Sequence, residues 1–213
     1  MNVHSFLLSL SYQIKHMVAL SKSDIKRNAL INATIKLVIS NGFHATPMSK
    51  IAKEACISPG TIYLYYKNKQ DLINNVYLHV KQKFTQAIFQ NYTNNTPVEE
   101  SFKIIWYQIA DYRLKEVAEA LFLSHCDNTP IIDDESRKEG IKHLQPLLDL
   151  WERGQIDGII KKACPYVLYA YAVYPLAFLI NAKQRDDYEL TDESKEQAFK
   201  MAWDSIKITE HKS

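Results

Sequence analysis

Polar and aromatic side chains suited to nucleic-acid contact gather on one short segment, residues 58–65. Hydroxyl and phenol groups hydrogen-bond to phosphates, and small or apolar side chains can approach base edges. If the segment is helical, the groups left on its outer side are Ser58, Gly60, Thr61, Tyr63, Leu64 and Tyr65. The chemistry they offer is noncovalent recognition of a nucleic acid.

Two short helices joined by a tight turn would present these groups. Thr46 is a candidate N-cap and Pro47 suits the first helical position, so we expect a helix from there to about Ala55. Ser58 and Pro59 repeat the pattern and predict a second helix of little more than one and a half turns, through Tyr65.

Helices joined by so short a turn cross steeply and pack closely. Ala52 supplies the small side chain expected at the crossing, and Asn68 is the candidate cap of the helix that follows. The side chains with the spacing to close a small core beneath the crossing are Ile51, Ala55, Ile57 and Ile62. The arrangement predicts a helix-turn-helix unit.

The charge distribution separates the chain into two parts. Residues 22–90 carry ten Lys and Arg against three Asp and Glu, a formal net charge of +7. Residues 91–213 carry fifteen against twenty-one, a net charge of −6, which the total of +2 conceals. A polyanion such as DNA is therefore the natural partner of the N-terminal part. The alternative is an ordinary helical hairpin whose polar side is merely solvated.

The same region carries further motifs. Gly42 and Phe43 form a helix stop, since glycine can take the left-handed conformation and the aromatic ring can fill the hairpin core. Lys69 and Leu72 open a later helix. The first helix carries an apolar stripe of Leu30, Ala33, Leu37 and Val38.

Together with the helix pair, these motifs make residues 27–73 resemble the N-terminal domain of the TetR/AcrR family of bacterial transcriptional regulators. The resemblance covers about a quarter of the chain. Two positions depart from the family pattern: Cys56 stands where the turn usually has glycine, and Tyr66 where phenylalanine is usual. A side chain at a position that needs positive φ costs about 1 kcal/mol and would shift the second helix slightly.

The resemblance implies a role for each residue of the helix pair. It assigns phosphate contacts to Thr46, Ser49, Tyr63, Tyr65 and Lys69. It places base edges next to Ser58, Pro59, Gly60, Thr61 and Leu64. No Arg, Asn or Gln stands on the short second helix to make paired hydrogen bonds with a base, so readout is expected to rely on hydroxyl groups, thymine methyls and DNA shape.

Length and composition fit this interpretation. The chain has 213 residues, and five glycines with long helical patterns favour an all-α fold. Three widely spaced cysteines, Cys56, Cys126 and Cys164, favour a reducing cytoplasm over a disulfide framework. Residues 1–20 lack the basic start of a signal peptide, and we expect them to be a mobile arm or to precede a true start at Met17.

Residues 21–72 are expected to form the DNA-binding domain, and residues 73–213 a helical domain to which the resemblance assigns effector binding and dimerisation. Thr96 and Pro97 predict another capped helix start. Further helices are expected over residues 115–126, 134–155, 165–183 and 191–208. The helix that connects the two domains carries an apolar stripe of Leu72, Val76, Val80, Phe84 and Ile88.

Residues 163–182 are uncharged and flanked by basic residues, so a transmembrane span is one alternative. Tyrosines, Pro175 and Asn181 dilute the hydrophobicity, which favours a soluble helix buried on all sides and no membrane partner. In the TetR/AcrR family the last two helices pair with their copies, so the resemblance implies a homodimer. Its expected apolar face contains Val167, Tyr171, Leu176 and Phe178.

Aromatic side chains are dense between residues 102 and 178. Each can be ordinary core, yet large rings with polar tips can also line a pocket for a drug-sized molecule. The resemblance implies such an effector pocket, for which the candidates are Trp106, Tyr107, Tyr112, Phe122, Trp151, Tyr171 and Tyr174. Aromatic faces favour a cationic effector, with Asp111, Glu116 and Glu119 as nearby carboxylates.

His125, Cys126 and Asp127 have the side-chain types of metal ligands, but adjacent side chains on a helix diverge. We therefore expect no metal, no cofactor and no catalytic cysteine–histidine pair. The sequence predicts a repressor that binds a palindromic operator as a dimer and is released by a small hydrophobic effector. The alternatives are a constitutive DNA-binding regulator, or an all-helical enzyme or lipid-handling protein with an incidental basic hairpin.

Overall fold

The computed structural model describes residues 21–209, in which every regular element is a helix and Ile160 and Lys207 form one isolated bridge. This confirms the all-α prediction. The arm predicted for residues 1–20, with its alternative start at Met17, lies outside the described residues. The helices are α2 (Lys22–Asn41), α3 (Met48–Glu54), α4 (Pro59–Ile62), α5 (Lys69–Ile88), α6 (Val98–Lys115), α7 (Val117–Asn128), α8 (Asp134–Lys142), α9 (Gln145–Ile156), α10 (Pro165–Ala172), α11 (Tyr174–Gln184) and α12 (Asp192–Ile206).

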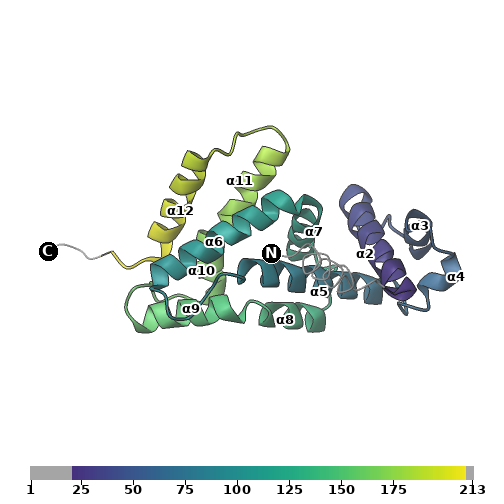
Figure 1. Ribbon diagram of the computed structural model, residues 1–213, viewed down its shortest axis with the longest axis horizontal. Helices are drawn as coiled ribbons and strands as arrows, with labels where there is room; N and C mark the ends of the chain where they lie inside the picture. Colours follow the sequence, from purple (N-terminus) through teal and green to yellow (C-terminus); the bar gives the residue numbers. More distant parts are fainter. Residues whose placement is uncertain (1–20, 210–213) are drawn as a thin grey trace, which may run out of the picture.

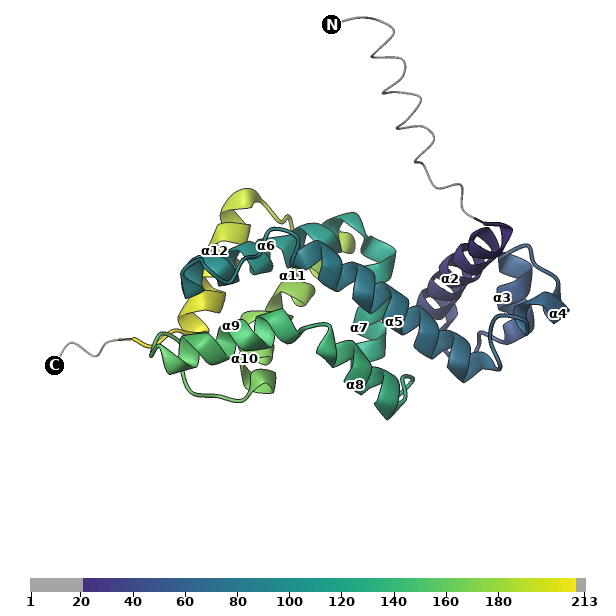
Figure 2. The same ribbon diagram turned by 60° about the horizontal axis from the view of Figure 1, so that its bottom comes forward.

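Helices α2, α3 and α4 gather at one end of an elongated molecule (Figure 1, Figure 2). Helix α5 runs from this group into the larger body formed by α6 to α12 (Figure 2). The segment predicted to contact DNA therefore stands at one tip, with α12 toward the opposite end.

The ends of α2 follow from local chemistry. Ser21 accepts a hydrogen bond from the Asp24 N–H, and the Asp24 carboxylate accepts one from the Ser21 N–H, which completes a capping box. At the other end Gly42 has φ 77°, a value that L side chains rarely adopt, so the predicted glycine stop is confirmed. The predicted stripe is also buried along its whole length, at Leu30, Ala33, Leu37 and Val38.

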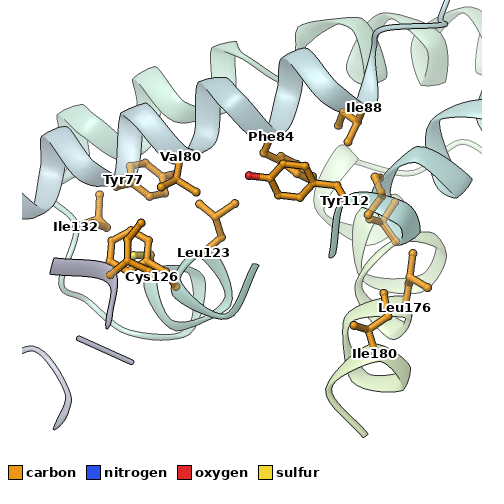
Figure 3. Close-up of a cluster of buried hydrophobic side chains, with 14 of the residues drawn as sticks. Tyr77, Val80, Phe84, Ile88, Tyr112, Leu123, Cys126, Ile132, Leu176 and Ile180 are labelled. Carbon is orange, nitrogen blue, oxygen red and sulfur yellow. The ribbon is translucent and has the colours of Figure 1, made fainter. Parts of the chain in front are cut away.

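Helix α5 begins at a confirmed cap, because Asn68 Oδ1 accepts the Asp71 N–H at 2.9 Å. All five residues of its predicted apolar stripe are buried. In Figure 3 the α5 side chains Tyr77 and Val80 lie next to Leu123 and Cys126 of α7, while Phe84 lies beside Tyr112 of α6. The ring centroids of Phe84 and Tyr112 are 5.1 Å apart. The apolar stripe of α5 thus packs against the larger body, while the same helix also contacts α2 at the other end of the molecule.

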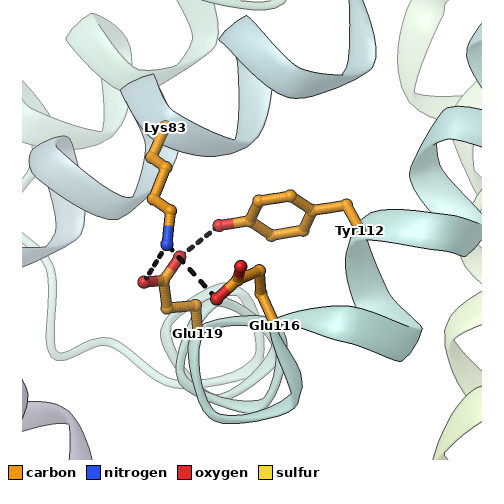
Figure 4. Close-up of polar contacts among 4 residues, drawn as sticks. All are labelled: Lys83, Tyr112, Glu116 and Glu119. Carbon is orange, nitrogen blue, oxygen red and sulfur yellow. Dashed lines mark hydrogen bonds and ion pairs between the residues drawn. The ribbon is translucent and has the colours of Figure 1, made fainter. Parts of the chain in front are cut away.

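A polar network joins α5 to the corner between α6 and α7 (Figure 4). Lys83 Nζ lies 2.8 Å from Glu119 Oε1 and 3.2 Å from Glu116 Oε2, and the Tyr112 hydroxyl donates to Glu119. Burial alone would lower the pKa of Lys83, but the hydrogen bonds and charges of both glutamates raise it. Since α7 also packs against α2, this corner connects the two ends of the molecule.

Two helices predicted as continuous are each divided near a proline. Residues 134–155 form α8 and α9, with Pro146 in the first turn of α9, and residues 165–183 form α10 and α11, with Pro175 in the first turn of α11. Proline lacks the N–H that continues a helix but is tolerated in a first turn. The second break frees the Ala172 carbonyl, which accepts the Trp106 indole N–H at 3.0 Å.

The predicted cap at Thr96 is wrong. Pro97 occupies the N-cap of α6 and makes no side-chain cap bond. The Thr96 hydroxyl instead donates to Thr93 O at 3.0 Å and lies 2.6 Å from Ser101 Oγ. It holds the preceding loop against α6.

The stretch Pro165–Gln184 is apolar and long enough to cross a membrane by length and composition, and less than half of it is buried in the protein. Core helices of soluble proteins meet the same criterion. The break at Val173 divides this stretch into two helices of eight and eleven residues.

Candidate nucleic-acid interface

Backbone hydrogen bonds close the turn between α3 and α4. The Cys56 N–H donates to Lys53 O at 3.1 Å, and the Ile57 N–H donates to Ala52 O at 2.8 Å. These two bonds make a Schellman motif, whose central residue has positive φ and is usually glycine. Cys56 has φ 55°, which confirms the predicted conformation at a position that is not glycine. Its side chain is exposed, so the strain is confined to the backbone.

A small core lies beneath the helix pair. Ile51, Ala52 and Ile62 have no exposed surface, and Ala55 and Ile57 are half-buried at its edge. The predicted crossing is thereby confirmed. It holds α3 and α4 in a fixed relation, so the outer side of α4 is presented by a rigid unit.

Helix α4 is shorter than predicted, because Tyr63, Leu64 and Tyr65 continue it as a turn. The predicted Ser58 cap is confirmed: its Oγ accepts the Thr61 N–H at 3.3 Å and lies 2.7 Å from Thr61 Oγ1. The two hydroxyl groups pair with each other in the free protein. A base or phosphate would have to share or replace that hydrogen bond.

The outer side of this segment exposes apolar groups. Leu64 is 83% exposed, and Tyr63 and Pro59 are also exposed. A Cβ atom at Gly60 would meet nothing within 4 Å, so no contact within the chain requires a glycine there. The missing side chain leaves room for close approach by another molecule.

The candidate phosphate ligands surround this surface unequally. Ser49 on α3 is exposed, whereas Tyr65 is half-buried. Lys69 Nζ lies 4.1 Å from the centre of the Phe43 ring and 3.5 Å from His44 O, and burial lowers the pKa of this lysine. A cation held against an aromatic ring by the α2–α3 loop is well placed to meet a phosphate.

Thr46 is placed differently from the sequence prediction. It has no exposed surface, and its hydroxyl donates to Gly42 O at 2.8 Å and to Leu37 O at 3.2 Å. Pro47, not Thr46, occupies the N-cap of α3. The side chain therefore fastens the loop after α2 from inside, and the predicted cap is wrong; a phosphate contact would require this hydroxyl to leave the two carbonyls.

Replacing Thr46 by valine is expected to lower the free energy of unfolding by about 1–3 kcal/mol, because two buried carbonyls lose a donor. The operator affinity of the folded protein should change little, since no phosphate contact is removed. Chemical denaturation and operator titration measure the two effects. Thr46→Ser keeps the hydroxyl and serves as the control; a clear loss of operator affinity in a folded valine variant would restore the phosphate role.

Three exposed lysines stand on α3 and just after α4: Lys50, Lys53 and Lys67. Their spacing gave no reason to predict a contact, and they counted only toward the net charge of the N-terminal part. Their exposure next to Ser49 and Leu64 adds positive charge along the same surface, where sequence-independent attraction of DNA is expected.

The seven aromatic residues predicted to line an effector pocket do not converge on one cavity. Phe122 and Trp151 are enclosed in the core, whereas Tyr171 and Tyr174 are exposed. Tyr107 borders a shallow depression of about 830 Å³ beside the start of α6, and Trp151 borders a separate one of about 260 Å³ at α9. An aromatic residue type indicates a large apolar side chain but not the direction in which it points.

The polar tips of three of these rings already have partners within the chain. The Trp106 indole donates to Ala172 O, the Tyr112 hydroxyl donates to Glu119, and the Tyr174 hydroxyl donates to Asn128 Oδ1 at 3.1 Å. Glu116 and Glu119, expected near a cationic effector, pair with Lys83. In this structure these groups are engaged within the chain, and a cationic effector would have to compete with those partners.

Cys126 is buried, and burial raises the pKa of its thiol. A nucleophilic cysteine needs the opposite shift, toward the thiolate. The environment of Cys126 is thus that of a packed core residue.

Comparisons with known proteins agree with this geometry. Residues 30–76 match the family model of bacterial regulatory proteins of the tetR family, and residues 77–208 match the tetracyclin repressor-like C-terminal domain. An uncharacterized HTH-type transcriptional regulator of Haemophilus influenzae is 26% identical over 188 residues, which cover 87% of this chain and 97% of that protein.

Solved structures share the fold over nearly the whole described chain. A TetR family regulator from Marinobacter aquaeolei has a TM-score of 0.82 and 26% identity, covering 88% of this chain and 98% of its own. The transcriptional regulator FadR of Bacillus subtilis, solved in complex with stearoyl-CoA, has a TM-score of 0.63 and 19% identity, covering 82% and 96%. With its helix-turn-helix at one tip and a helical C-terminal body, this chain belongs to the TetR family of DNA-binding transcriptional regulators and is not an enzyme.

Proposed function

We propose that the chain is a cytoplasmic repressor that binds a palindromic operator as a homodimer and is released by a small apolar effector. The observation that carries the DNA-binding part is the exposed edge around Leu64, which stands at the tip of the molecule with lysines on both sides. A leucine exposed to that degree finds a partner at thymine methyl groups in the major groove.

The opposite part of the molecule supports the dimer. Phe178 is 65% exposed, and other apolar side chains on α10 and α11 are also exposed. These are Val167, Tyr171 and Tyr174, and Met201 on α12 is exposed as well. Helix α10 packs against both α11 and α12, and exposed apolar side chains on neighbouring helices favour an interface. Leu176, predicted on the same face, points inward and is buried.

A second copy is the partner that fits this face best. One helix-turn-helix unit covers only a half-site, and two units must meet successive turns of the duplex to give adequate specificity. A twofold axis through the far body would place the two α4 segments on the same side of a duplex. Residues 21–72 would then serve DNA binding, and residues 73–213 dimerisation and effector binding.

Effector release requires contact between the two ends. Helix α7 packs against α2, and a groove of about 710 Å³ between them is lined by Lys36 and Ile39 of α2 and by Val117 and Leu121 of α7. A ligand that shifts α6 or α7 would move α2 and change the spacing of the reading surfaces. The stearoyl-CoA bound to FadR, a protein of the same fold, supports an effector that carries an apolar chain.

The test begins with the DNA next to the protein's own gene. Footprinting should show a protected palindrome, and titration should show binding of a dimer whose affinity falls steeply with salt. Weak binding without sequence preference would contradict the proposal. A palindrome that is bound but insensitive to every apolar compound bound by the protein would leave a constitutive regulator.

Lys69→Ala is expected to weaken binding by a similar factor for all operator variants and to reduce the salt slope of the dimer by about 1.8, because each of the two protomers loses one phosphate contact worth about 0.9. Thr61→Ala should instead change which single-base variants are preferred and leave the slope unchanged. Fluorescence anisotropy over a set of operator variants at several salt concentrations measures both. Lys162→Ala, an exposed lysine in the far body, is the control. A change of base preference in Lys69→Ala would show that the role assigned to Lys69 is wrong.

A further inference from the structure

Two cations are enclosed in the body of the molecule. Lys81 on α5 is 6% exposed and Arg113 on α6 is 7% exposed. Burial lowers the pKa of Lys81; Asp127 opposes this shift, and the positive charge of Arg113 adds to it. The centre of the Phe84 ring lies 5.9 Å from Lys81 Nζ and 5.1 Å from the ring of Tyr112, the residue before Arg113, so both cations lie in one region of the contact between α5 and α6.

Neither cation has a carboxylate partner among residues 21–209. The ion pairs in this part of the chain use other lysines and arginines. Arg113 Nη1 donates to the neutral Ser124 Oγ at 3.2 Å, and the Tyr169 hydroxyl is its other hydrogen-bonding neighbour. Asp127, whose charge reaches Lys81, is exposed and forms no ion pair with it.

Buried charges are usually paired, because an ion removed from water without a counter-charge is strongly destabilising. Two buried cations in one region create a positive potential. No carboxylate among the described residues forms an ion pair with either of them, so a bound anion would interact favourably with both.

Apolar side chains also lie beside the two cations. Val80 and Phe84 flank Lys81 along α5, and Lys81 Nζ lies 5.9 Å from the centre of the Phe84 ring. Leu123 of α7 faces the same stretch of α5, with Leu176 and Ile180 of α11 farther along (Figure 3). An acidic ligand bound at the two cations could therefore place an apolar chain against these side chains.

We propose that Lys81 and Arg113 bind the acidic head group of an amphiphilic effector, a carboxylate or a phosphate attached to an apolar chain. The inference rests on the proposed effector-responsive function and gives that effector a charge opposite to the one expected from the aromatic residues. Lys81 lies on the same helix as Lys69, about 18 Å away along the axis, and Arg113 lies just before the corner that leads to α7. A head group that drew α5 and α6 together would thus act on both connections to the DNA-binding end.

Calorimetric titration of the full-length protein tests the head group with matched twelve-carbon probes. Dodecanoate, dodecyl phosphate and lauroyl-CoA are the acidic arms; dodecanol and dodecyltrimethylammonium are the neutral and cationic ones. We expect at least one acid to bind at least about tenfold more tightly than dodecanol, the value of one charged hydrogen bond. If dodecanoate binds most tightly, the head group is a free carboxylate. If dodecyl phosphate or lauroyl-CoA binds most tightly, the head group is a phosphate.

Variants test the residues. Lys81→Met and Arg113→Met should each weaken the acid by at least about tenfold, whereas Lys81→Arg should retain most of the affinity. Lys103→Met, an exposed lysine on α6, is the matched control and should change nothing. Without ligand, Lys81→Met should unfold at a higher temperature than the unmodified protein, because an unpaired buried charge is removed.

The proposal is overturned if dodecanol binds as tightly as every acid, if no acid binds, or if Lys81→Met leaves the affinity unchanged. A large fall in the unfolding temperature of Lys81→Met would also count against it, since that would reveal an existing counter-charge. Operator affinity measured in parallel separates the two proposals. If an acid binds through Lys81 but does not release DNA, the anion-binding site is supported and the effector role is refuted.

Discussion

Replacing Phe178 by aspartate is expected to turn the dimer into monomers and to lower operator affinity by at least about 100-fold, since each 1.4 kcal/mol lost is a factor of ten. Phe178 is 65% exposed on α11, within the apolar face proposed for the second copy. In a twofold interface the substitution appears twice, and each aspartate would be buried without a partner. The intrinsic fold should persist, because the side chain does not enter the monomer core.

Sedimentation velocity and operator titration measure the two effects on the same sample. Phe178→Leu keeps an apolar side chain and should remain dimeric. Ile141→Asp places the same charge on an exposed apolar position of α8, outside the proposed face, and should bind DNA normally. An unmodified protein that sediments as a monomer while binding the palindrome tightly would rule out the dimer model.

Replacing Phe102 by alanine is expected to lower the free energy of unfolding by about 3–5 kcal/mol, the usual cost of removing a fully buried aromatic ring. The Phe102 ring on α6 lies 5.9 Å from that of Trp203 and 6.2 Å from that of Phe199, both on α12. In a chain of this size the unfolding temperature should fall by roughly 10 °C. Because α12 carries Met201 of the proposed interface, the dimer should weaken as well.

Thermal and chemical denaturation quantify this loss. Phe102→Leu leaves a smaller cavity and is expected to cost roughly 1 kcal/mol. If alanine had no larger effect than leucine, α12 would be held to the body by contacts other than this aromatic cluster.

The helix caps show how far local sequence predicts structure. Three Ser/Thr–Pro pairs each predicted a capped helix start, but only Ser58 caps its helix. Thr46 and Thr96 use their hydroxyl groups to hold loops, Thr46 through contacts with residues four and nine positions away. A pattern of neighbouring residues describes the local competition for hydrogen bonds, but not the acceptors that tertiary packing brings near.

The same limit separates the two parts of the candidate site, the DNA-contacting residues and the effector residues. The proposed DNA-contacting surface is continuous in sequence, so residues 58–65 could be proposed from spacing alone, and the positive φ of Cys56 could be expected from the place of a missing glycine. The effector residues come from several helices, and their directions depend on packing. Lys81 was missed because its buried stripe on α5 contains polar residue types, Asn74 and Thr85 among them, that pattern analysis assigns to solvent.

The unusual turn residue also has an experimental use. Of the three cysteines, Cys56 and Cys164 are exposed and Cys126 is buried. After replacement of Cys164 by serine, each protomer would carry a single accessible thiol, placed beside α4. A nitroxide attached there would sit on each reading surface, so dipolar spectroscopy could measure the separation of the two in solution. Compared with the 34–36 Å between successive major-groove faces, that separation would distinguish an operator-ready dimer from a released one without any DNA in the sample.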